Sequence, residues 1–230
     1  MKKIVVFSGA GVSAESGIKT FRDQNGLWEN HDINEVATPQ AWAKNPALVL
    51  KFYNQRRKQM FEVSPNSAHK AIAKLEKYYD VTVITQNVDD LHERAGSSNV
   101  IHLHGELKNA RCEKENCHIY DFRERPINLG DFCENGHQLR PDIVWFGEMV
   151  PMMEKANFIA STADIFIVVG TSLNVYPAAG IIHYLNQGIP CYLIDPNIPQ
   201  YNFPNNWEII EKKAGSGMPE LYQKLTEDLK

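Results

Sequence analysis

A glycine-rich turn directly follows a short apolar run near the N-terminus of the chain. Ile4 to Phe7 has the composition of a buried strand, and Gly9-Ala10-Gly11 opens a stretch of small and hydroxyl residues that continues to Asp23. A strand that ends in such a turn and leads into a helix directs unpaired backbone N–H groups and the positive end of the helix dipole at one point, which suits a pyrophosphate. We therefore expect a nucleotide site here.

The turn differs from the Gly-x-Gly-x-x-Gly fingerprint of dehydrogenases. Ala14 stands where the third glycine would be, and Gly17 comes three residues later. The turn is therefore typical of a dinucleotide site but not of a dehydrogenase. A tight strand-to-helix turn without a ligand is the alternative that this motif alone leaves open.

Composition limits the class of protein and its partners. The 230 residues suit one α/β domain, or a large domain that carries a small insertion. The 24 Lys and Arg and the 28 Asp and Glu are mixed along the chain, with a net charge of -4, so we expect no nucleic-acid or membrane partner. The few apolar residues after Met1-Lys2-Lys3 are too short for a signal peptide, which predicts a cytoplasmic protein.

Apolar runs typical of strands alternate with helical patterns, at residues 4–7, 81–85, 100–103, 165–169 and 191–194. This alternation predicts an α/β fold with a Rossmann-like, doubly wound parallel sheet. Three of the runs are followed by Gly9-Ala10-Gly11, by Gln86-Asn87-Val88-Asp89 and by Gly170-Thr171-Ser172. Ligands of such sheets bind at the carboxyl ends of the strands.

Two stretches interrupt the alternation and predict a second, smaller lobe. Residues 26–64 read as helices and loops, and residues 109–139 are polar and contain clustered cysteines. The large lobe is then expected to comprise residues 1–25, 65–108 and 140–230 of a single domain. A helix is expected over Ala47 to Phe61, and another closes the chain over Pro219 to Leu229.

Two polar motifs lie near strand ends. The amides of Gln86 and Asn87 match a ribose hydroxyl or a carboxamide in both donor and acceptor sense, and Asp89 can accept from an amide N–H. A helix N-cap is the alternative for these residues. His102 and His104 lie two residues apart, on one face if the segment is extended, so one of them is a candidate proton acceptor. Two ordinary strand-end histidines are the alternative.

In this order, the motifs Gly-Ala-Gly-x-Ser, Thr-Phe-Arg, Gln-Asn-x-Asp and His-x-His-Gly resemble the sirtuin family of NAD-dependent protein-lysine deacylases. Residues 140–148 (Arg-Pro-Asp-Ile-Val-Trp-Phe-Gly-Glu) and Gly170-Thr171-Ser172 extend the resemblance over nearly the whole chain. The resemblance implies that the NAD contacts are Gly9, Ala10, Gly11, Ser13, Ala14, Thr20, Phe21, Arg22, Trp28, Gln86, Asn87, Asp89, His104, Gly170, Thr171, Ser172, Asp195, Pro196, Asn197 and Ala214. Asp195 stands where an asparagine is expected.

The resemblance also implies a reaction. The acyl-lysine carbonyl oxygen attacks the ribose carbon as nicotinamide leaves, and His104 then acts as general base on the ribose hydroxyls. With Asn87 as the second catalytic residue, the products are free lysine, nicotinamide and 2′-O-acyl-ADP-ribose. Val144, Trp145 and Phe146 would form the slot for the lysine stem, where the substrate backbone pairs as an added strand.

Tyr53 and Arg56 share a face of the helix expected over 47–61. Their pattern resembles the class III sirtuins, whose Tyr and Arg receive acidic acyl groups, and Ala37 resembles the small residue that widens the acyl pocket there. Guanidinium binds carboxylate through two charge-assisted hydrogen bonds. We therefore expect desuccinylation and demalonylation beside deacetylation. A solvated basic face made of Arg56, Arg57 and Lys58 is the alternative.

Three of the four cysteines, Cys112, Cys117 and Cys133, lie in one short polar segment, which suggests a metal. Sirtuins typically carry four zinc cysteines in this module. His137 can replace the missing one, to give a structural zinc site of three thiolates and one imidazole, with His118 as a weaker candidate. A degenerate module without metal is the alternative. Cys191 lies in an apolar strand and reads as a buried small hydrophobe.

Two rival functions stay open at this point. Mono-ADP-ribosyl transfer on the same fold also begins by displacing nicotinamide. A non-catalytic NAD-binding adaptor would use the cysteine module to contact partners. His104 and Asn87 weigh against the adaptor, and a carboxylate receptor at Arg56 has no evident use in the transferase. The expected partners are acylated-lysine proteins, and the expected oligomeric state is a monomer.

Overall fold

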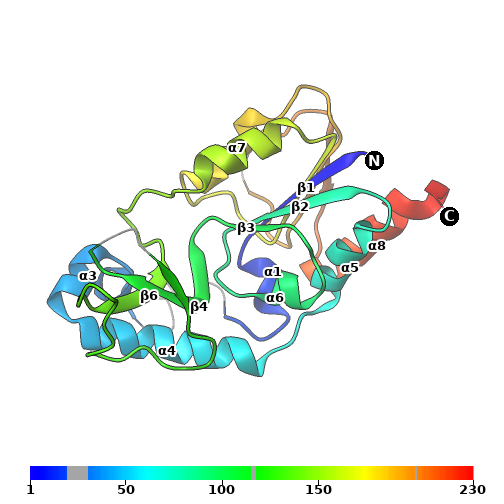
Figure 1. Cartoon of the computed structure of the whole chain (residues 1–230). Coiled ribbons are helices and arrows are strands. Elements are labelled where there is room, and N and C mark those ends of the chain that lie inside the picture. The colour runs from blue at the N-terminus through cyan, green and yellow to red at the C-terminus, as the bar shows by residue number, and fades with distance from the viewer. Residues whose placement is uncertain (20–30, 115–117, 200, 230) are drawn as a thin grey trace.

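The computed structural model describes residues 1–19, 31–114, 118–199 and 201–229. Its larger unit is a six-stranded sheet in the order β3-β2-β1-β7-β8-β9, and every neighbouring pair is parallel. Figure 1 labels the strands β3, β2 and β1 of this sheet. Numbered within the sheet, this is the doubly wound order 3-2-1-4-5-6, so the predicted fold class is confirmed. The strands are β1 (Lys3–Ser8), β2 (Asp80–Thr85), β3 (Val100–His102), β7 (Ile165–Val169), β8 (Cys191–Ile194) and β9 (Trp207–Ile210).

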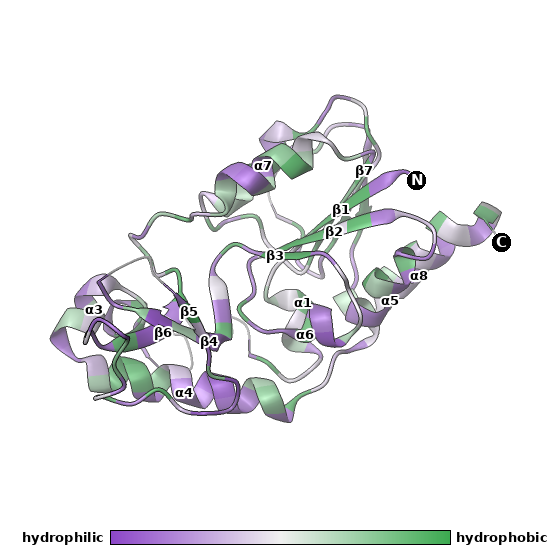
Figure 2. Ribbon diagram, in the orientation of Figure 1, coloured by the Kyte–Doolittle hydropathy of each residue, from purple (hydrophilic) through white to green (hydrophobic). Residues whose placement is uncertain are grey.

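Alternate residues of β1 pack on opposite faces of the sheet, as the period of a strand requires. Ile4 and Val6 belong to one core cluster, together with residues of α5 (Ser67–Leu75) and α8 (Ala214–Thr226). Val5 and Phe7 belong to the opposite cluster, together with residues of α7 (Met153–Ser161) and the 3-10 helix η1 (Ala178–Tyr184). Figure 2 shows that the central strands between these helical layers are apolar over much of their length.

The smaller lobe contains short helices and a three-stranded antiparallel sheet in the order β5-β4-β6. The helix α4 packs against β4 and β6, and their side chains form a separate core cluster. The predicted boundary at residue 109 falls inside β4, and β6 extends beyond residue 139. The elements are α2 (Ile33–Val36), α3 (Pro39–Lys44), α4 (Pro46–Glu62), β4 (Gly105–Cys112), β5 (Ile119–Asp121) and β6 (Leu139–Ile143).

The closing helix α8 begins at Ala214 and contains Pro219, where the sequence pattern had predicted a start at Pro219. Proline lacks the N–H that would reach the carbonyl of Gly215, four residues earlier. The Ser67 hydroxyl donates to that carbonyl at 2.5 Å instead. The proline is therefore tolerated inside the helix. No helix in the described parts of the chain is both long and apolar enough to cross a membrane.

Glycines allow the loop after β1 and the loop after β7 to touch where the strand order reverses. Gly11 N–H donates to the carbonyl of Gly170 at 2.8 Å. Gly170 has φ of 63°, and a Cβ there would lie 2.2 Å from the backbone nitrogen of Val12. A side chain at this position would therefore have to push the two loops apart.

We predict that Gly170→Ala lowers the free energy of unfolding by about 3–5 kcal/mol, from left-handed strain together with overpacking. Gly188→Ala is the matched control, because Gly188 also has a positive φ, 78°, but a Cβ there meets nothing within 4 Å. It should lose only about 1–2 kcal/mol. Urea unfolding measures both variants, and equal losses would contradict the steric explanation.

Candidate functional site

The candidate site lies along the carboxyl ends of β1, β2, β3, β7 and β8. The loops after β7 and β8 carry Gly170, Thr171 and Ser172 and, beside them, Asp195, Pro196 and Asn197. The N-terminal end of α8, which begins at Ala214, is tied to the loop after α1 by a bond from Gly215 N–H to Glu15 Oε2 at 2.7 Å. Thr20, Phe21, Arg22 and Trp28, which the resemblance also assigns to NAD, lie outside the described residues.

The backbone N–H groups of the first turn differ from expectation. The N–H of Gly11 donates to Gly170, that of Val12 to the carbonyl of Gly9, and that of Ser13 to the carbonyl of Ala10. The helix α1 (Gly11–Ala14) that follows is a single turn. These three N–H groups therefore do not point at a pyrophosphate. The glycines serve the close approach of the two loops.

Ser13 is the centre of a buried hydrogen-bond network. Its hydroxyl donates to Asp89 Oδ2 at 3.0 Å and accepts from Asn87 Nδ2 at 3.0 Å. Its third contact is His69 Nε2 at 3.4 Å. Because His69 Nδ1 accepts from the N–H of Asn66, the neutral ring carries its hydrogen on Nε2 and donates it to Ser13. The single donor and both acceptor sites of the hydroxyl are therefore used.

This network orients the side chain of Asn87. Since the only hydrogen of the Ser13 hydroxyl goes to Asp89, the amide nitrogen of Asn87 must face Ser13 and its Oδ1 must face away. Asn87 Oδ1 is buried and has no hydrogen-bond partner among the described residues. A buried acceptor in this position fits an amide N–H of a ligand.

Asp89 is buried beside this acceptor. Burial raises the pKa of its carboxyl to about 6, although hydrogen bonds from Leu91 N–H and Ser13 act in the opposite direction. Its Oδ1 accepts from Leu91 N–H at 3.2 Å. The N-cap of the helix that begins at Leu91 is Asp90, which makes no side-chain cap bond, so the N-cap alternative does not hold for Asp89. At pH 7 the carboxyl is mostly ionised and can accept from a ligand donor.

Two further histidines, His69 and His92, belong to this region but were not assigned from the sequence. Their rings are 4.9 Å apart in an edge contact, and His92 Nε2 lies 2.9 Å from the Ser8 hydroxyl. Burial lowers the pKa of His69 to about 4 and that of His92 well below its ordinary value, so both are neutral. No spacing in the sequence links His69 to Ser13, because α5 brings it there from 56 positions away.

His104 has the geometry of a base. Its Nδ1 lies 3.0 Å from the carbonyl oxygen of Gln86, which can only accept, so Nδ1 carries the ring hydrogen. Burial lowers the pKa of His104, although the bond to Gln86 opposes this. The ring is therefore neutral at pH 7 and Nε2 has its lone pair. Gln86 in turn donates through Nε2 to the Thr171 hydroxyl at 3.1 Å, which joins the β2 and β7 loops.

The segment Val144 to Phe146 connects the two lobes of the site. Val144 N–H donates to the carbonyl of His104 at 2.9 Å, and Phe146 N–H donates to the carbonyl of Ala37 at 3.0 Å. Trp145 Nε1 donates to the Tyr53 hydroxyl at 3.1 Å. The structure therefore joins Ala37 to Phe146 and Tyr53 to Trp145.

Glu148 holds this segment in place, a role that its sequence motif does not indicate. Arg140 donates to both carboxylate oxygens of Glu148 at 2.8 Å, and Trp145 N–H donates to Oε2 at 2.7 Å. The Arg140 guanidinium also stacks on the Trp145 ring, 3.6 Å from its centroid. Such a two-pronged ion pair fixes direction as well as distance.

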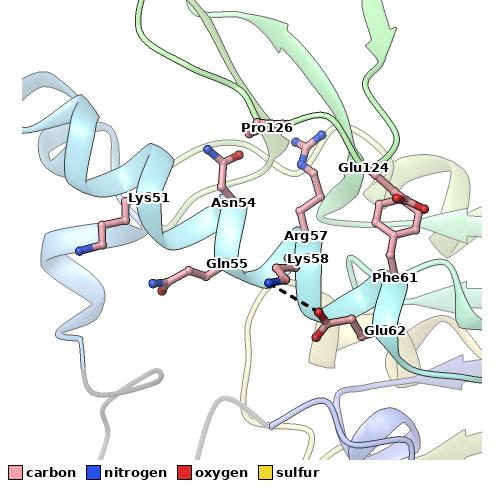
Figure 3. Close-up of a pocket in the computed structure, with 9 residues that line it drawn as sticks. All are labelled: Lys51, Asn54, Gln55, Arg57, Lys58, Phe61, Glu62, Glu124 and Pro126. Carbon is pink, nitrogen blue, oxygen red and sulfur yellow. Dashed lines mark ion pairs between the residues drawn. The ribbon is translucent and has the colours of Figure 1, made fainter.

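The consecutive basic residues of α4 have three different environments. Arg57 is 1% exposed and points from α4 toward the loop at Pro126 (Figure 3), where it donates to backbone carbonyls including that of Asn109 at 3.3 Å. Burial lowers its pKa to about 10. The Lys58 side chain is 80% exposed and pairs with Glu62. The alternative of one solvated basic face is therefore wrong for Arg57.

Arg56 lies near the acyl-slot residues. Its guanidinium is 4.5 Å from the centroid of the Phe52 ring. Tyr53 is fully buried, which raises its pKa, and the charge of Arg56 is among the groups that lower it. The charge of Arg56 therefore reaches the Tyr53 hydroxyl.

The cysteine module forms a compact set of potential metal ligands. Cys112 Sγ lies 3.5 Å from Cys133 Sγ and 3.6 Å from His137 Nδ1. Two ligand atoms bound tetrahedrally to one zinc at ~2.3 Å lie roughly 3.5–3.8 Å apart, so these three fit such an ion. Cys117 lies outside the described residues. Cys191 is buried in β8, which raises its pKa to about 12. The thiol is therefore uncharged, as expected for a buried small hydrophobic side chain.

Known proteins match this chain in sequence and in fold. Residues 9–177 match the Sir2 family. A Helicobacter pylori protein named NAD-dependent protein deacylase is 55% identical over 227 residues, which cover 99% of this chain and 99% of that protein. The chain belongs to the Sir2 family.

Solved structures agree in fold over the whole chain. A Sir2 homologue in complex with NAD is 42% identical, with a TM-score of 0.88 over 100% of this chain and 91% of that one. A Sir2 homologue mutant in complex with 2′-O-acetyl ADP ribose is also 42% identical, with a TM-score of 0.88 over 99% of this chain and 93% of that one.

Proposed function

We propose that this protein is an NAD-dependent protein-lysine deacylase that removes acetyl and acidic acyl groups and releases nicotinamide and 2′-O-acyl-ADP-ribose. The observation that carries the proposal is that a neutral His104 and the buried acceptor Asn87 Oδ1, which faces away from Ser13, lie at the same sheet edge. The name of the Helicobacter pylori relative and the ligands of the two similar structures support it.

The residues divide the work between recognition and proton transfer. Bound NAD supplies the ribose carbon that is attacked and nicotinamide as the leaving group. Asn87 Oδ1 and the Asp89 carboxylate accept from the carboxamide of nicotinamide, while Ser13 keeps both side chains oriented. His104 Nε2 takes a proton from a ribose hydroxyl, because its other nitrogen is already held by Gln86. Trp145 and its neighbours bind the extended lysine and exclude water.

Phosphate recognition is assigned to residues other than the first turn. The N–H groups of Gly11, Val12 and Ser13 are used within the protein. The remaining candidates from the resemblance are Ala10 and the stretch Thr20 to Arg22. The adenosine part of NAD is proposed to bind to the β7 loop, at Gly170, Thr171 and Ser172, and to the β8 loop. In the β8 loop, Asp195 stands in the place of an asparagine.

Mono-ADP-ribosyl transfer on the same fold is the rival function. Both reactions displace nicotinamide, but only deacylation needs a receptor for the acyl group. Ala37, Tyr53 and Trp145 are fully or nearly fully buried and belong to one core cluster. A receptor for the acyl group at these residues would serve deacylation only, which is why we favour deacylation.

Incubation with NAD and acetyl-lysine or succinyl-lysine peptides, followed by mass spectrometry, tests the function. We expect acyl-ADP-ribose from the wild type and a 10²- to 10⁴-fold lower rate from His104→Ala, because a general base is lost. His183→Gln, at an exposed histidine of η1, is the control and should keep full activity. ADP-ribose transferred to protein without acyl-ADP-ribose would favour the rival.

The acidic-acyl specificity predicts a selective effect of Arg56→Met. Loss of the charge-assisted pair should cost roughly 1.5–3 kcal/mol with succinyl-lysine, or about tenfold or more in kcat/KM. Acetyl-lysine has no carboxylate, so its kcat/KM should change much less. Tyr53→Phe should show a smaller loss of the same selectivity, since one neutral donor is removed.

Lys58→Met is the matched control for that experiment, because it removes a positive charge from the same helix at an exposed position. It should leave kcat/KM unchanged for both the succinyl-lysine and the acetyl-lysine peptide. Equal losses on succinyl and acetyl peptides in Arg56→Met would refute the carboxylate receptor.

A structural zinc held by Cys112, Cys117, Cys133 and His137 is part of the proposal. Zinc would cross-link β4 to the turn at Cys133 to His137, remote from the reacting groups. Elemental analysis of protein purified without added metal should find about one zinc per chain, and less than about a third of that in Cys133→Ser. Cys191→Ala, outside the module, should keep the metal. Wild-type protein with less than about a third of a zinc ion per chain would support the metal-free alternative.

The substrates are proposed to be acylated-lysine proteins. A cytoplasmic location, a monomeric state and the absence of nucleic-acid and membrane partners stay predictions from the sequence.

A further inference from the structure

His102 is held between two groups that can only accept hydrogen bonds. Its Nδ1 lies 2.9 Å from the carbonyl oxygen of Asn87, and its Nε2 lies 2.7 Å from Glu93 Oε1. A carbonyl oxygen and a carboxylate have no hydrogen to give. Both ring nitrogens of His102 must therefore carry hydrogen, which makes the ring an imidazolium.

The surrounding charges support this protonation state. Glu106 Oε2 lies 3.7 Å from His102 Nε2, and Lys108 Nζ lies 2.7 Å from the same carboxylate oxygen. Burial lowers the pKa of His102, but the bond to Glu93 and the charges of Glu93 and Glu106 outweigh it, and the pKa lies above its ordinary value. Burial is the largest single influence on the pKa of Glu93 and would raise it. The bond to His102, the charge of His102, a backbone hydrogen bond and the charge of Lys108 together place this pKa below its ordinary value.

Other titratable groups face the same ring. The charge of His102 lowers the pKa of both Asp89 and His92. The charge of Asp90 raises the pKa of Asp89 and of Lys108. His92 is neutral at pH 7, and the Lys108 ammonium pairs with Glu106, so Glu93 is the carboxylate that bonds the ring directly.

The two histidines brace consecutive peptide groups of one loop. His104 donates to the carbonyl of Gln86 and His102 to that of Asn87. Glu93, in α6 (Leu91–Arg94), then ties the far side of the His102 ring to the helix that follows the loop. On the opposite side of the loop, the Asn87 side chain reaches Ser13. The Asn87 carbonyl and the Asn87 side chain are thus both anchored.

We propose that His102 is a positioning residue, an imidazolium that links the Asn87 carbonyl to Glu93 and so directs Asn87 Oδ1 at the nicotinamide carboxamide. This inference rests on the proposed use of NAD. It gives the two histidines opposite duties, since His104 must be neutral to accept a proton and His102 must be charged to hold two acceptors. It also gives Glu93 a role that the sequence did not suggest.

The protonation of His102 is measured directly by ¹H–¹⁵N correlation spectra of its ring, assigned by comparison with His102→Gln. We expect both nitrogens protonated at pH 7 in the wild type, and deprotonation at lower pH in Glu93→Gln. A neutral ring at pH 7 would overturn the proposal. This measurement does not depend on any enzymatic activity.

The positioning role is measured by calorimetric binding of NAD and of ADP-ribose, which lacks nicotinamide. In His102→Gln the amide can still reach Glu93 but not the Asn87 carbonyl, so NAD affinity should fall roughly tenfold while ADP-ribose affinity stays within about twofold. His102→Asn keeps the donor toward Asn87 and should lose less. His183→Gln is again the control.

The pH profile separates this role from a general structural one. Because the pKa of His102 is raised, the brace is complete below that pKa, and the preference for NAD over ADP-ribose should decline as pH rises through it. His102→Gln should lack this decline. Equal weakening of both ligands, or none, would overturn the proposal. A wild type that binds NAD but does not deacylate would refute the proposed function and leave this inference intact.

Discussion

The contact between the loops after β1 and β7 is the constraint on which the rest of the site depends. It is possible only because Gly11 and Gly170 have no side chains where the two backbones meet. Their approach places the single turn of α1 above the carboxyl edge of the sheet, and with it Ser13. From there Ser13 reaches Asn87 and Asp89, which come from the neighbouring strand β2. The glycines therefore act through packing more than through their own N–H groups.

The hydrogen-bond partners of each side chain set its protonation state and its orientation at the site. His102 and His104 each present Nδ1 to a carbonyl oxygen of the same loop. They differ at Nε2, where His102 meets the carboxylate of Glu93. In the proposed mechanism this one difference separates a neutral base from a cationic brace. The same logic orients the amide of Asn87, because the hydroxyl of Ser13 has only one hydrogen to give.

The smaller lobe depends on arginines that work inside the protein. Arg140 clamps Glu148 and stacks on Trp145, which fixes the segment beside His104. Arg57 donates to the carbonyls of Lys108 and Asn109 in β4 and to those of Arg123 and Arg125 in the loop that precedes β6. Guanidinium suits both tasks because it offers several donors in a rigid plane and is weakly hydrated compared with an ammonium group.

The sequence by itself determined the sheet class and much of the site. Apolar runs that alternate with helical patterns predicted the parallel sheet, and the polar residues that follow one run placed Gln86, Asn87 and Asp89 at its carboxyl edge. Apolar runs did not predict strands that are only partly buried. They missed β9 because two of its four residues are exposed. Local patterns carry a signal only where one face is consistently buried.

Tertiary structure alone decided which side chains are hydrogen-bond partners. Nothing local links His69 to Ser13, Glu93 to His102 or Glu148 to Trp145, because these pairs form only after separate elements pack. It also decided that the N–H groups of the first turn are consumed by the protein, and that Arg57 is buried beside an exposed Lys58. Helical period sets which way a side chain leaves the helix, but the segment that covers it comes from elsewhere in the chain. Hydrogen-bond partners, and the protonation states that follow from them, are therefore properties of the fold.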